Sequence, residues 1–256
     1  MGLLQGKKAL IFGVANEKSI AWAIAEAFRN EGADLAFTYA NETVAKRVIP
    51  LAESVGAELV LPCNVQNDGE IKAVFREVGE RWGGLDILIH SIAFANKDEL
   101  KGSFLTTSRE GFALALDVSA YSFIALAKEA FPLMRERGGS MLTLTYYGAQ
   151  KVFPNYNVMG VAKAALEASV RYLAEAVGPD GVRVNAISAG PLKTLAAAGV
   201  GGFNSIAGHV EEQAPLRRNI TQEEVAGAAL YLCSHLARGV TGEIHFVDSG
   251  YNIIGL

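Results

Sequence analysis

Tyr156 and Lys163 are the two residues of this sequence best suited to act together on a carbonyl group, and both lie in the stretch PNYNVMGVAK, residues 154–163. A neutral phenol donates a hydrogen bond at pH 7, and a nearby ammonium group favours developing negative charge. The pair therefore suits the stabilisation of an oxyanion while a bound cofactor delivers a hydride. The alternative is that Tyr156 is an ordinary aromatic at a helix start and Lys163 a solvated lysine, and that neither takes part in catalysis.

The spacing of this pair departs from the usual one. Many nicotinamide-dependent reductases place the lysine four residues after the tyrosine, whereas here Met159 holds that position and the separation is seven residues. On the helix predicted from Pro154 to Gly178, seven residues rotate about 700° and rise about 10.5 Å, and four residues leave about 40° and about 6 Å between side chains. Both spacings place the two side chains on one face, but the longer one moves the tyrosine about one turn away.

The run SMLTLTY, residues 140–146, predicts a strand that ends in the aromatic pair Tyr146 and Tyr147. Ordinary short-chain reductases carry a serine near this point, which assists the tyrosine. Here Tyr146 would line an acyl pocket or donate a second hydrogen bond, unless it is only a core aromatic at a strand end.

Seven short apolar or β-branched runs alternate with longer helical patterns along the chain. Near-continuous apolar runs of this length are typical of parallel strands covered on both faces. This alternation, without any linker or repeat, predicts an α/β fold: one Rossmann-type, doubly wound dinucleotide-binding domain over residues 1–256 with a seven-stranded parallel sheet. The predicted strands are residues 8–13, 33–39, 58–65, 85–93, 140–146, 182–188 and 243–250.

The segment 191–220 fits this alternation least well, because it is long, holds four glycines and separates the sixth strand from the last helix. Such an insertion in a compact domain is typical of a lid or a binding loop, so we expect it to bind substrate. A surface excursion is the plainer alternative. Thr221 and Glu224, directly after it, form the pattern of a capping box.

The first strand leads into a turn suited to a nucleotide, because ligands of open parallel sheets bind beyond the carboxyl ends of the strands. Gly13 begins the stretch GVANEKSIAWAIA, and Ser19 precedes a predicted helix. The free N–H groups and the dipole at that helix start would attract a pyrophosphate, and Ser19 would add a hydroxyl donor.

Three further predicted strands end at the same edge of the sheet as this turn. Asn64 and Val65 follow the third strand, where the asparagine side chain would accept from an adenine amino group. Small residues at 90–95 would let a cofactor pass close to the backbone. At 189–194, the amide of Leu192 would meet a nicotinamide carboxamide.

The end of the second strand bears on the choice between NADH and NADPH. Residues 38–41 hold no Asp or Glu for a ribose 2′-hydroxyl and no Arg or Lys for a 2′-phosphate. The missing cation favours NADH, while Lys18 in the first turn leaves NADPH open.

The net charge of −4 and the absence of any long basic run argue against nucleic acid as a partner. Cys63 and Cys233 are far apart and form no CxxC motif, so we expect two buried thiols in a reducing compartment rather than a disulfide or a zinc site. The amino-terminal residues lack the layout of a signal peptide, and no apolar run reaches 18 residues. A cytoplasmic protein without a membrane span is the expectation.

Five stretches, in order and spacing, make the whole chain resemble the divergent NADH-dependent enoyl-[acyl-carrier-protein] reductases of the short-chain dehydrogenase/reductase superfamily. These stretches are GVANEKSIAWAIA, HSIAFA, LTYYGAQKVFPNYNVMGVAKAALEASVRYLA, GVRVNAISAGPLKTLAA and APLRRNIT. The resemblance implies reduction of a trans-2-enoyl thioester on acyl carrier protein, in the last step of fatty acid elongation. It also implies a homotetramer, because the family is usually tetrameric.

The resemblance assigns roles to particular residues. Hydride would go to the β-carbon, Tyr156 would hydrogen-bond the enolate oxygen, and Lys163 would hold the nicotinamide ribose. Tyr146, Tyr156, Ala95 and Met159 would line the substrate site, and residues 195–210 would close over the acyl chain. The implied cofactor contacts are Gly13, Ser19, Ile20, Ala40, Asn64, Val65, Ile92, Lys163, Leu192, Lys193, Thr194, Leu195 and Ala196.

The chain departs from the family pattern at several positions. Asn64 stands where aspartate is frequent, Ala40 where a polar or basic side chain is frequent, and Ala93 where glycine is common. Acyl carrier protein is acidic, yet residues 195–208 contain no Lys or Arg. A basic docking patch would have to come from elsewhere, with Arg217 and Arg218 as candidates.

Two other functions remain open from the residues alone. An ordinary short-chain ketone or alcohol oxidoreductase would need a Tyr-x3-Lys pair and an upstream serine, and Met159 and Tyr146 speak against it. A catalytically silent nucleotide-binding regulator would account for the fold and the first turn, but not for Tyr156 and Lys163.

Overall fold

Seven parallel strands form one sheet in the order β3-β2-β1-β4-β5-β6-β7, in a computed structural model that describes residues 2–195, 197–199 and 201–255. The order reverses between β1 and β4, which is the switch point of a doubly wound sheet. The predicted α/β fold with a seven-stranded parallel sheet is thereby confirmed. The strands are β1 Lys8–Phe12, β2 Asp34–Tyr39, β3 Leu59–Pro62, β4 Ile87–His90, β5 Gly139–Thr145, β6 Val182–Ala189 and β7 Ile244–Val247.

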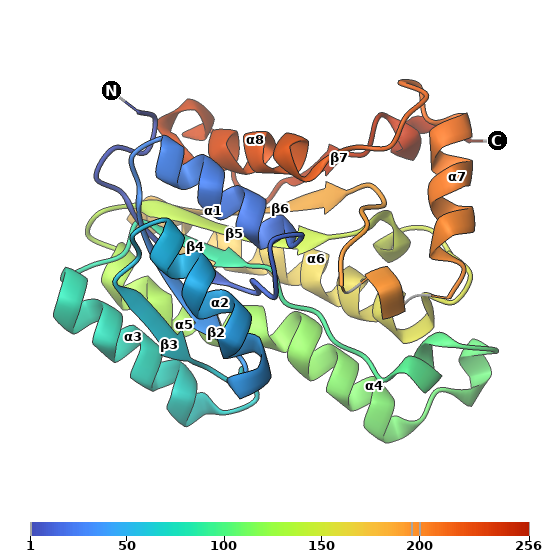
Figure 1. Ribbon diagram of the computed structural model, residues 1–256, viewed down its shortest axis with the longest axis horizontal. Helices are drawn as coiled ribbons and strands as arrows, with labels where there is room; N and C mark the ends of the chain where they lie inside the picture. The colour runs from blue at the N-terminus through green and yellow to red at the C-terminus, as the bar shows by residue number, and fades with distance from the viewer. Residues whose placement is uncertain (1, 196, 200, 256) are drawn as a thin grey trace.

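Helices cover both faces of the sheet, and this explains why the strands read as continuous apolar runs (Figure 1). Along β1, Ala9 and Ile11 belong to one buried core, and Leu10 and Phe12 belong to the other. The first core is completed by α1 Ile20–Asn30, α2 Glu42–Ser54 and α8 Gln222–Cys233, and the second by α3 Asp68–Trp82, α5 Ser122–Met134 and α6 Asn157–Val177.

Five predicted strand ends lie further along the chain than the observed ones, those of β1, β3, β4, β5 and β7. The fourth strand ends at His90 rather than at residue 93, because the backbone turns away after Ser91 N donates to Phe12 O. β5 ends at Thr145, since Tyr146 already begins the 3-10 turn Tyr147–Ala149. Tyr146 is therefore presented from a turn beyond the strand.

The start of α6 also differs from the prediction. The helix begins at Asn157 and not near Pro154, because Asn155 and Asn157 both have positive φ angles of 62° and 37°. Asparagine tolerates this region better than most residues. Tyr156 stands between them as the residue before the first helical turn, so the ideal helical rotation does not describe its position relative to Lys163.

The 191–220 insertion lies at the carboxyl-end edge of the sheet. The arrows of β5 and β6 point toward the end of the molecule at which α7 stands (Figure 1). The insertion is partly helical, with α7 at Phe203–Gln213, and it leads into α8. The predicted capping box is confirmed, since Thr221 Oγ1 accepts from Glu224 N and the Glu224 carboxylate accepts from Thr221 N.

One helical stretch, Arg109–Met134, is long and apolar enough to cross a membrane by length and composition, with a mean hydropathy of 1.4. It comprises α4 Arg109–Leu116, a π-helical turn at Asp117–Tyr121, and α5. In this stretch, 56% of the most apolar window is buried inside the protein. Its apolar character is that of a core helix, which packs against α3 and α6.

Candidate active site

The turn after β1 requires a glycine. Gly13 has a φ of 99°, and a Cβ atom at this position would lie 2.0 Å from the carbonyl oxygen of Ser91. The ends of β1 and β4 therefore meet here without room for a side chain. Such a close backbone approach at the switch point suits a pyrophosphate that lies against the main chain.

Ser19 organises the same turn and precedes Ile20, the first residue of α1. Its buried hydroxyl accepts from Ala15 N at 3.0 Å and from Asn16 N at 3.1 Å. The sequence suggested a hydroxyl donor for phosphate, but this hydroxyl is directed to Asn16 Oδ1 at 3.4 Å. Ser19 therefore shapes the turn, and its contact with a cofactor phosphate stays a prediction.

The ends of β2 and β3 present polar side chains to solvent. Ala40 follows β2 and adds no charge, and Asn41 after it caps α2 by accepting from Val44 N at 3.1 Å. Asn64, just before Val65, is exposed, and its side-chain oxygen accepts from Gln66 N at 3.1 Å. A carbonyl oxygen has two lone pairs, so one acceptor position is left for an adenine amino group.

Three of the residues predicted to bind substrate lie in one apolar cluster beyond β4 and at the start of α6. Ala95 and Tyr156 pack against Met159 and its buried neighbours, although Ala95 lies 64 residues from Met159 in the sequence. Ile92, predicted to contact the cofactor, packs against the second core of the sheet. The fold thus brings Ala95, Tyr156 and Met159 to one place.

The rings of Tyr146 and Tyr156 meet edge to face, with centroids 5.1 Å apart. Burial raises the pKa of both phenols well above the ordinary value; Tyr146 and Glu167 add to the shift of Tyr156, and Tyr251 adds to that of Tyr146. Both phenols are therefore neutral hydrogen-bond donors at any physiological pH. Gly148 makes room for this arrangement, since a Cβ atom there would lie 2.5 Å from the Tyr156 ring.

Lys163 is buried on α6, with 6% of its surface exposed, and its Nζ donates to the carbonyl oxygen of Leu144 at 2.8 Å. The interpretation of Lys163 as a solvated lysine is therefore wrong. Burial lowers the pKa of the ammonium group to about 8, and the Glu167 carboxylate opposes that shift. Lys163 is charged at neutral pH and close to its titration range.

Three polar residues around this site, Glu167, Ser119 and His90, were not among those expected from the sequence. Glu167 is buried one helical turn after Lys163, and this spacing on one helix face was a signal that could have identified it. Ser119, in the π-helical turn, both accepts from Phe94 N at 3.0 Å and donates to Phe94 O at 3.1 Å. Ser119 therefore holds the segment that leads to Ala95. No sequence pattern indicated this role of Ser119.

His90 is the third polar residue that was not expected from the sequence, and it is fully buried between two hydroxyl groups. Ser122 Oγ donates to Val118 O at 2.7 Å, so it must accept from His90 Nε2–H at 2.8 Å. The ring nitrogen Nδ1 then accepts from the Thr143 hydroxyl at 2.7 Å. Burial, aided by Lys163, lowers the pKa of His90 to about 3. His90 is a neutral brace that joins β4, β5 and α5.

The first residues of the insertion extend from β6. Leu192 is buried, Lys193 is exposed, and Thr194 N donates to Leu192 O at 2.9 Å. Leu195 is 56% exposed, although it was expected to contact the cofactor. Ala196, the last predicted cofactor contact, lies outside the described residues.

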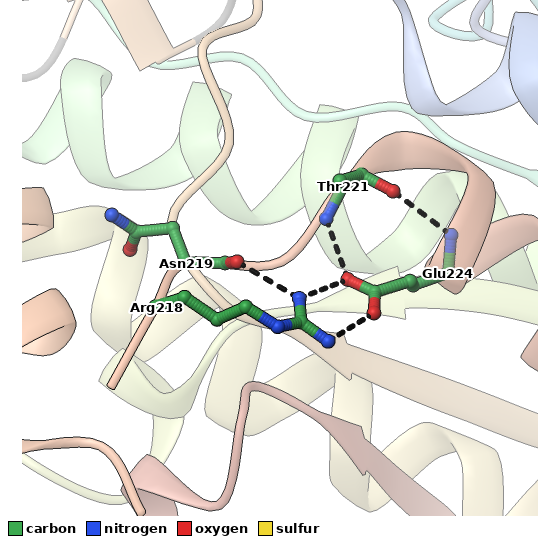
Figure 2. Close-up of polar contacts among 4 residues, drawn as sticks. All are labelled: Arg218, Asn219, Thr221 and Glu224. Carbon is green, nitrogen blue, oxygen red and sulfur yellow. Dashed lines mark hydrogen bonds and ion pairs between the residues drawn. The ribbon is translucent and has the colours of Figure 1, made fainter. Parts of the chain in front are cut away.

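Arg218 is held by the protein itself. Its guanidinium makes two parallel bonds to the Glu224 carboxylate, at 2.8 Å and 2.6 Å, and donates to Asn219 O (Figure 2). Arg217 Nη1 donates to the backbone oxygen of Glu212. Because a carboxylate offsets the Arg218 charge, this arginine is a poor source of a docking patch for an acidic partner.

Cys63 and Cys233 are both buried as free thiols, as expected. Burial raises the pKa of each thiol to about 12, so neither is a nucleophile at neutral pH.

The doubly wound sheet, the side-chain-free turn at its switch point and the buried lysine beyond β5 define a Rossmann-type dinucleotide-binding protein. The family described as enoyl-(acyl carrier protein) reductase matches residues 13–252. The chain therefore belongs to the enoyl-(acyl carrier protein) reductase family, within the short-chain dehydrogenase/reductase superfamily.

The similar proteins agree with this assignment. The NADH enoyl-[acyl-carrier-protein] reductase FabI of Rickettsia prowazekii is 56% identical over 254 residues, which cover 99% of this chain and 97% of that protein. The Bacillus cereus enoyl-acyl carrier protein reductase, solved with NADP+ and an indole naphthyridinone, is 56% identical, covers both chains fully and has a TM-score of 0.97. The Anaplasma phagocytophilum reductase, solved with NAD, is 52% identical with a TM-score of 0.96, covering 100% of this chain and 97% of that one.

Proposed function

We propose that this protein reduces the trans-2 double bond of enoyl thioesters carried by acyl carrier protein, with NADH as the hydride donor. The observation that carries the proposal is the convergence of Tyr146, Tyr156 and Lys163 at the carboxyl ends of the strands, in a chain 56% identical over 254 residues to an NADH enoyl reductase. We also take residues 1–256 as a single reductase domain.

The site residues fit a nicotinamide dinucleotide. Gly13 places no side chain against the backbone after β4, and α1 begins seven residues later, at Ile20. The Lys163 ammonium has three N–H groups, and among the described residues Leu144 O accepts one of them, which leaves donors for ribose hydroxyls. The turns at Asn64–Val65 and Leu192–Leu195 would hold the adenine and nicotinamide ends.

The bound cofactor supplies the hydride, and the protein supplies position and electrostatics. Addition at the β-carbon makes the thioester an enolate, whose negative oxygen Tyr156 would stabilise by donating its phenol hydrogen. The raised pKa of Tyr156 keeps that hydrogen in place. The Lys163 charge lowers the energy of the developing anion, and proton uptake at the α-carbon completes the reaction. Tyr146 would shape the pocket around the reacting carbons.

The proposal includes a preference for NADH over NADPH. Ala40, at the end of β2, offers no cation to a 2′-phosphate. Lys18 lies exposed in the first turn, and the Bacillus cereus relative was solved with NADP+. The two cofactors are therefore compared directly in the experiment below.

The proposal also covers the partners and setting of the enzyme. The substrate thioester would be presented by acyl carrier protein, with Ala95, Tyr146, Tyr156 and Met159 along the acyl path. We propose a cytoplasmic homotetramer, in keeping with the family.

The test is to mix the purified protein with NADH and crotonyl-CoA or a crotonyl carrier protein, and to follow the loss of NADH absorbance. We expect turnover, with NADPH less effective. Tyr156→Phe should lower kcat/KM by about 10- to 100-fold, since a hydrogen bond to a charged oxygen contributes about 1.5–3 kcal/mol. Reduction of a simple ketone without turnover of crotonyl thioesters would instead establish an ordinary short-chain oxidoreductase.

A further inference from the structure

Glu167 is a buried carboxylate that the proposed reaction does not use. It is 5% exposed and lies four residues after Lys163 on α6. Four residues on a helix separate side chains by about 40° of rotation and about 6 Å of rise, so both occupy one face. In the part of the chain that the structure describes, Lys163 is the only buried lysine or arginine.

The hydrogen bonds of the Glu167 carboxylate come from neutral groups. Thr145 Oγ1 donates to Oε1 at 2.9 Å, and Gln150 Nε2 donates to Oε2 at 3.3 Å. Neutral donors satisfy the lone pairs but leave the negative charge uncompensated, and a buried charge is costly unless a charge of opposite sign lies nearby. Lys163 supplies that charge from the preceding turn.

The lysine and the glutamate hold consecutive residues of one strand. Lys163 Nζ donates to Leu144 O at 2.8 Å, and the next residue, Thr145, donates to Glu167. Tyr146 follows directly. The two charged side chains therefore clamp the end of β5 from which Tyr146 extends into the site.

We propose that Glu167 is a positioning residue for the reduction: its carboxylate keeps the Lys163 ammonium charged and fixes the carboxyl end of β5. This inference rests on the proposed function, which gives Lys163 its role. Among the described residues, His90 on β4 interacts with Lys163, Tyr156 before α6 interacts with Glu167, and Tyr146 after β5 packs against Tyr156.

These neighbours leave Glu167 as the group that acts on the charge of Lys163. The low pKa of His90 keeps that ring neutral, and the raised pKa values of both phenols keep them neutral as well. Asp117, in the π-helical turn packed against α6, accepts from Gln66 at 2.9 Å. Burial lowers the pKa of Lys163, and Glu167 is the cause that opposes the shift.

The sign of the effect follows from this balance. Lys163 is active when protonated, below its pKa of about 8. Glu167→Gln removes the negative charge while its side-chain oxygen still accepts from Thr145. The lysine then loses its proton at lower pH, and the alkaline limb of the kcat profile should move down by about one pH unit.

The experiment compares pH profiles of kcat and KM for crotonyl thioester reduction in three variants. Glu167→Gln should shift the alkaline limb, whereas Thr145→Val, which removes a hydrogen bond but keeps the carboxylate, should leave the limb at its wild-type pH. Glu167→Asp keeps the negative charge, so its alkaline limb should lie close to the wild-type pH. Equal limbs in wild type and Glu167→Gln would overturn the inference, as would an equal shift in Thr145→Val.

A second measurement does not depend on turnover. The 13Cε shift of Lys163, assigned by its loss in Lys163→Met, should titrate at lower pH in Glu167→Gln than in wild type. If wild-type protein reduced no enoyl thioester but the Lys163 titration moved as expected, the proposed function would fail and the coupling would stand. An unmoved titration in an active enzyme would refute the coupling alone.

Discussion

The β5–α6 region and the 191–220 insertion meet at the same end of the sheet, but they are held in opposite ways. Lys163 and Glu167 are buried, and their polar atoms are engaged by the adjoining strand and turn. Leu195 and Leu216, in the insertion, are 56% and 61% exposed.

The insertion is attached to the rest of the protein by a few side-chain hydrogen bonds. Asn155 Nδ2 donates to Gly201 O at 3.1 Å, and Arg218 pairs with the Glu224 carboxylate of α8. Within the insertion, Asn219 Nδ2 donates to Ala207 O at 3.1 Å. Segments with few buried contacts open at low free-energy cost. We therefore expect the proposed catalytic groups to be fixed within the fold, and the insertion, which we propose covers the substrate, to adjust to acyl chains of different length.

The largest expected effect comes from a substitution in the β5–α6 region. Lys163→Met should lower kcat/KM by about 100-fold or more, because it removes both a ribose donor and the charge that favours the enolate. Steady-state kinetics with crotonyl-CoA and NADH measures the loss. Lys151→Met, at an exposed position in the loop before α6, is the control and should retain wild-type rates. Similar losses in both variants would remove the distinction between the two lysines.

Gly148→Ala should be the next most damaging change. The added methyl would lie 2.5 Å from the partly buried Tyr156 ring, so the ring or the turn must shift. We expect a loss of about 1–3 kcal/mol in the free energy of unfolding, with lower kcat. Gly178→Ala is the matched control, because its φ is −58° and no atom lies within 4 Å of the added Cβ. Denaturant unfolding should separate the two variants; equal stabilities would contradict the tight packing at Tyr156.

On the loosely attached side, Asn219→Ala should act on binding rather than on chemistry. Removal of its hydrogen bond to Ala207 frees α7 and should raise KM for longer acyl substrates by about 3- to 10-fold, with kcat little changed. Kinetics with thioesters of increasing chain length tests this. A fall in kcat with unchanged KM would place the insertion among the groups that govern the chemical step.

The smallest effect is expected where the insertion joins α8. Arg218, together with the Thr221 N–H, lowers the pKa of Glu224 from 4.5 to about 2. A depressed carboxylate pKa stabilises the fold above the unfolded-state value, and this stability is lost as pH falls from about 4.5 toward 2. Because the Glu224 side chain is 36% exposed, we expect Glu224→Gln to cost about 1 kcal/mol or less at pH 7.

Thermal melts across pH measure this difference. The gap between wild type and Glu224→Gln should close as the pH approaches 2, while Glu211→Gln, at an exposed position on α7, should melt like wild type throughout. A gap that persists at low pH would show that packing, not the ion pair, carries the effect.

The sequence predicted the regular part of the fold because each strand is a short apolar run, and because the turns and helix starts carry local residue patterns. Gly13 and the Thr221 capping box are local signals of this kind, and both match the structure. Tyr156 and Lys163 were recognised because the residues between them match a family pattern.

Features that depend on tertiary contacts were not predictable in the same way. The His90 brace requires β4, β5 and α5 to meet, and the Ser119 contacts require a π-helical turn. The displaced start of α6 follows from two asparagines with positive φ, which no apolar periodicity encodes. Arg218 looked like a free cation because its partner, Glu224, had been assigned only a capping role.

The contact between Gly13 and the Ser91 carbonyl also sets limits on how the enzyme can be changed. Since even a methyl group at position 13 would collide with the backbone of Ser91, just after β4, this turn cannot be used to retune cofactor choice. The end of β2 carries no such restriction, because Ala40 is followed by Asn41, whose capping role leaves the alanine side chain uncommitted. Directed evolution toward NADPH should therefore accumulate substitutions at position 40 and none at position 13.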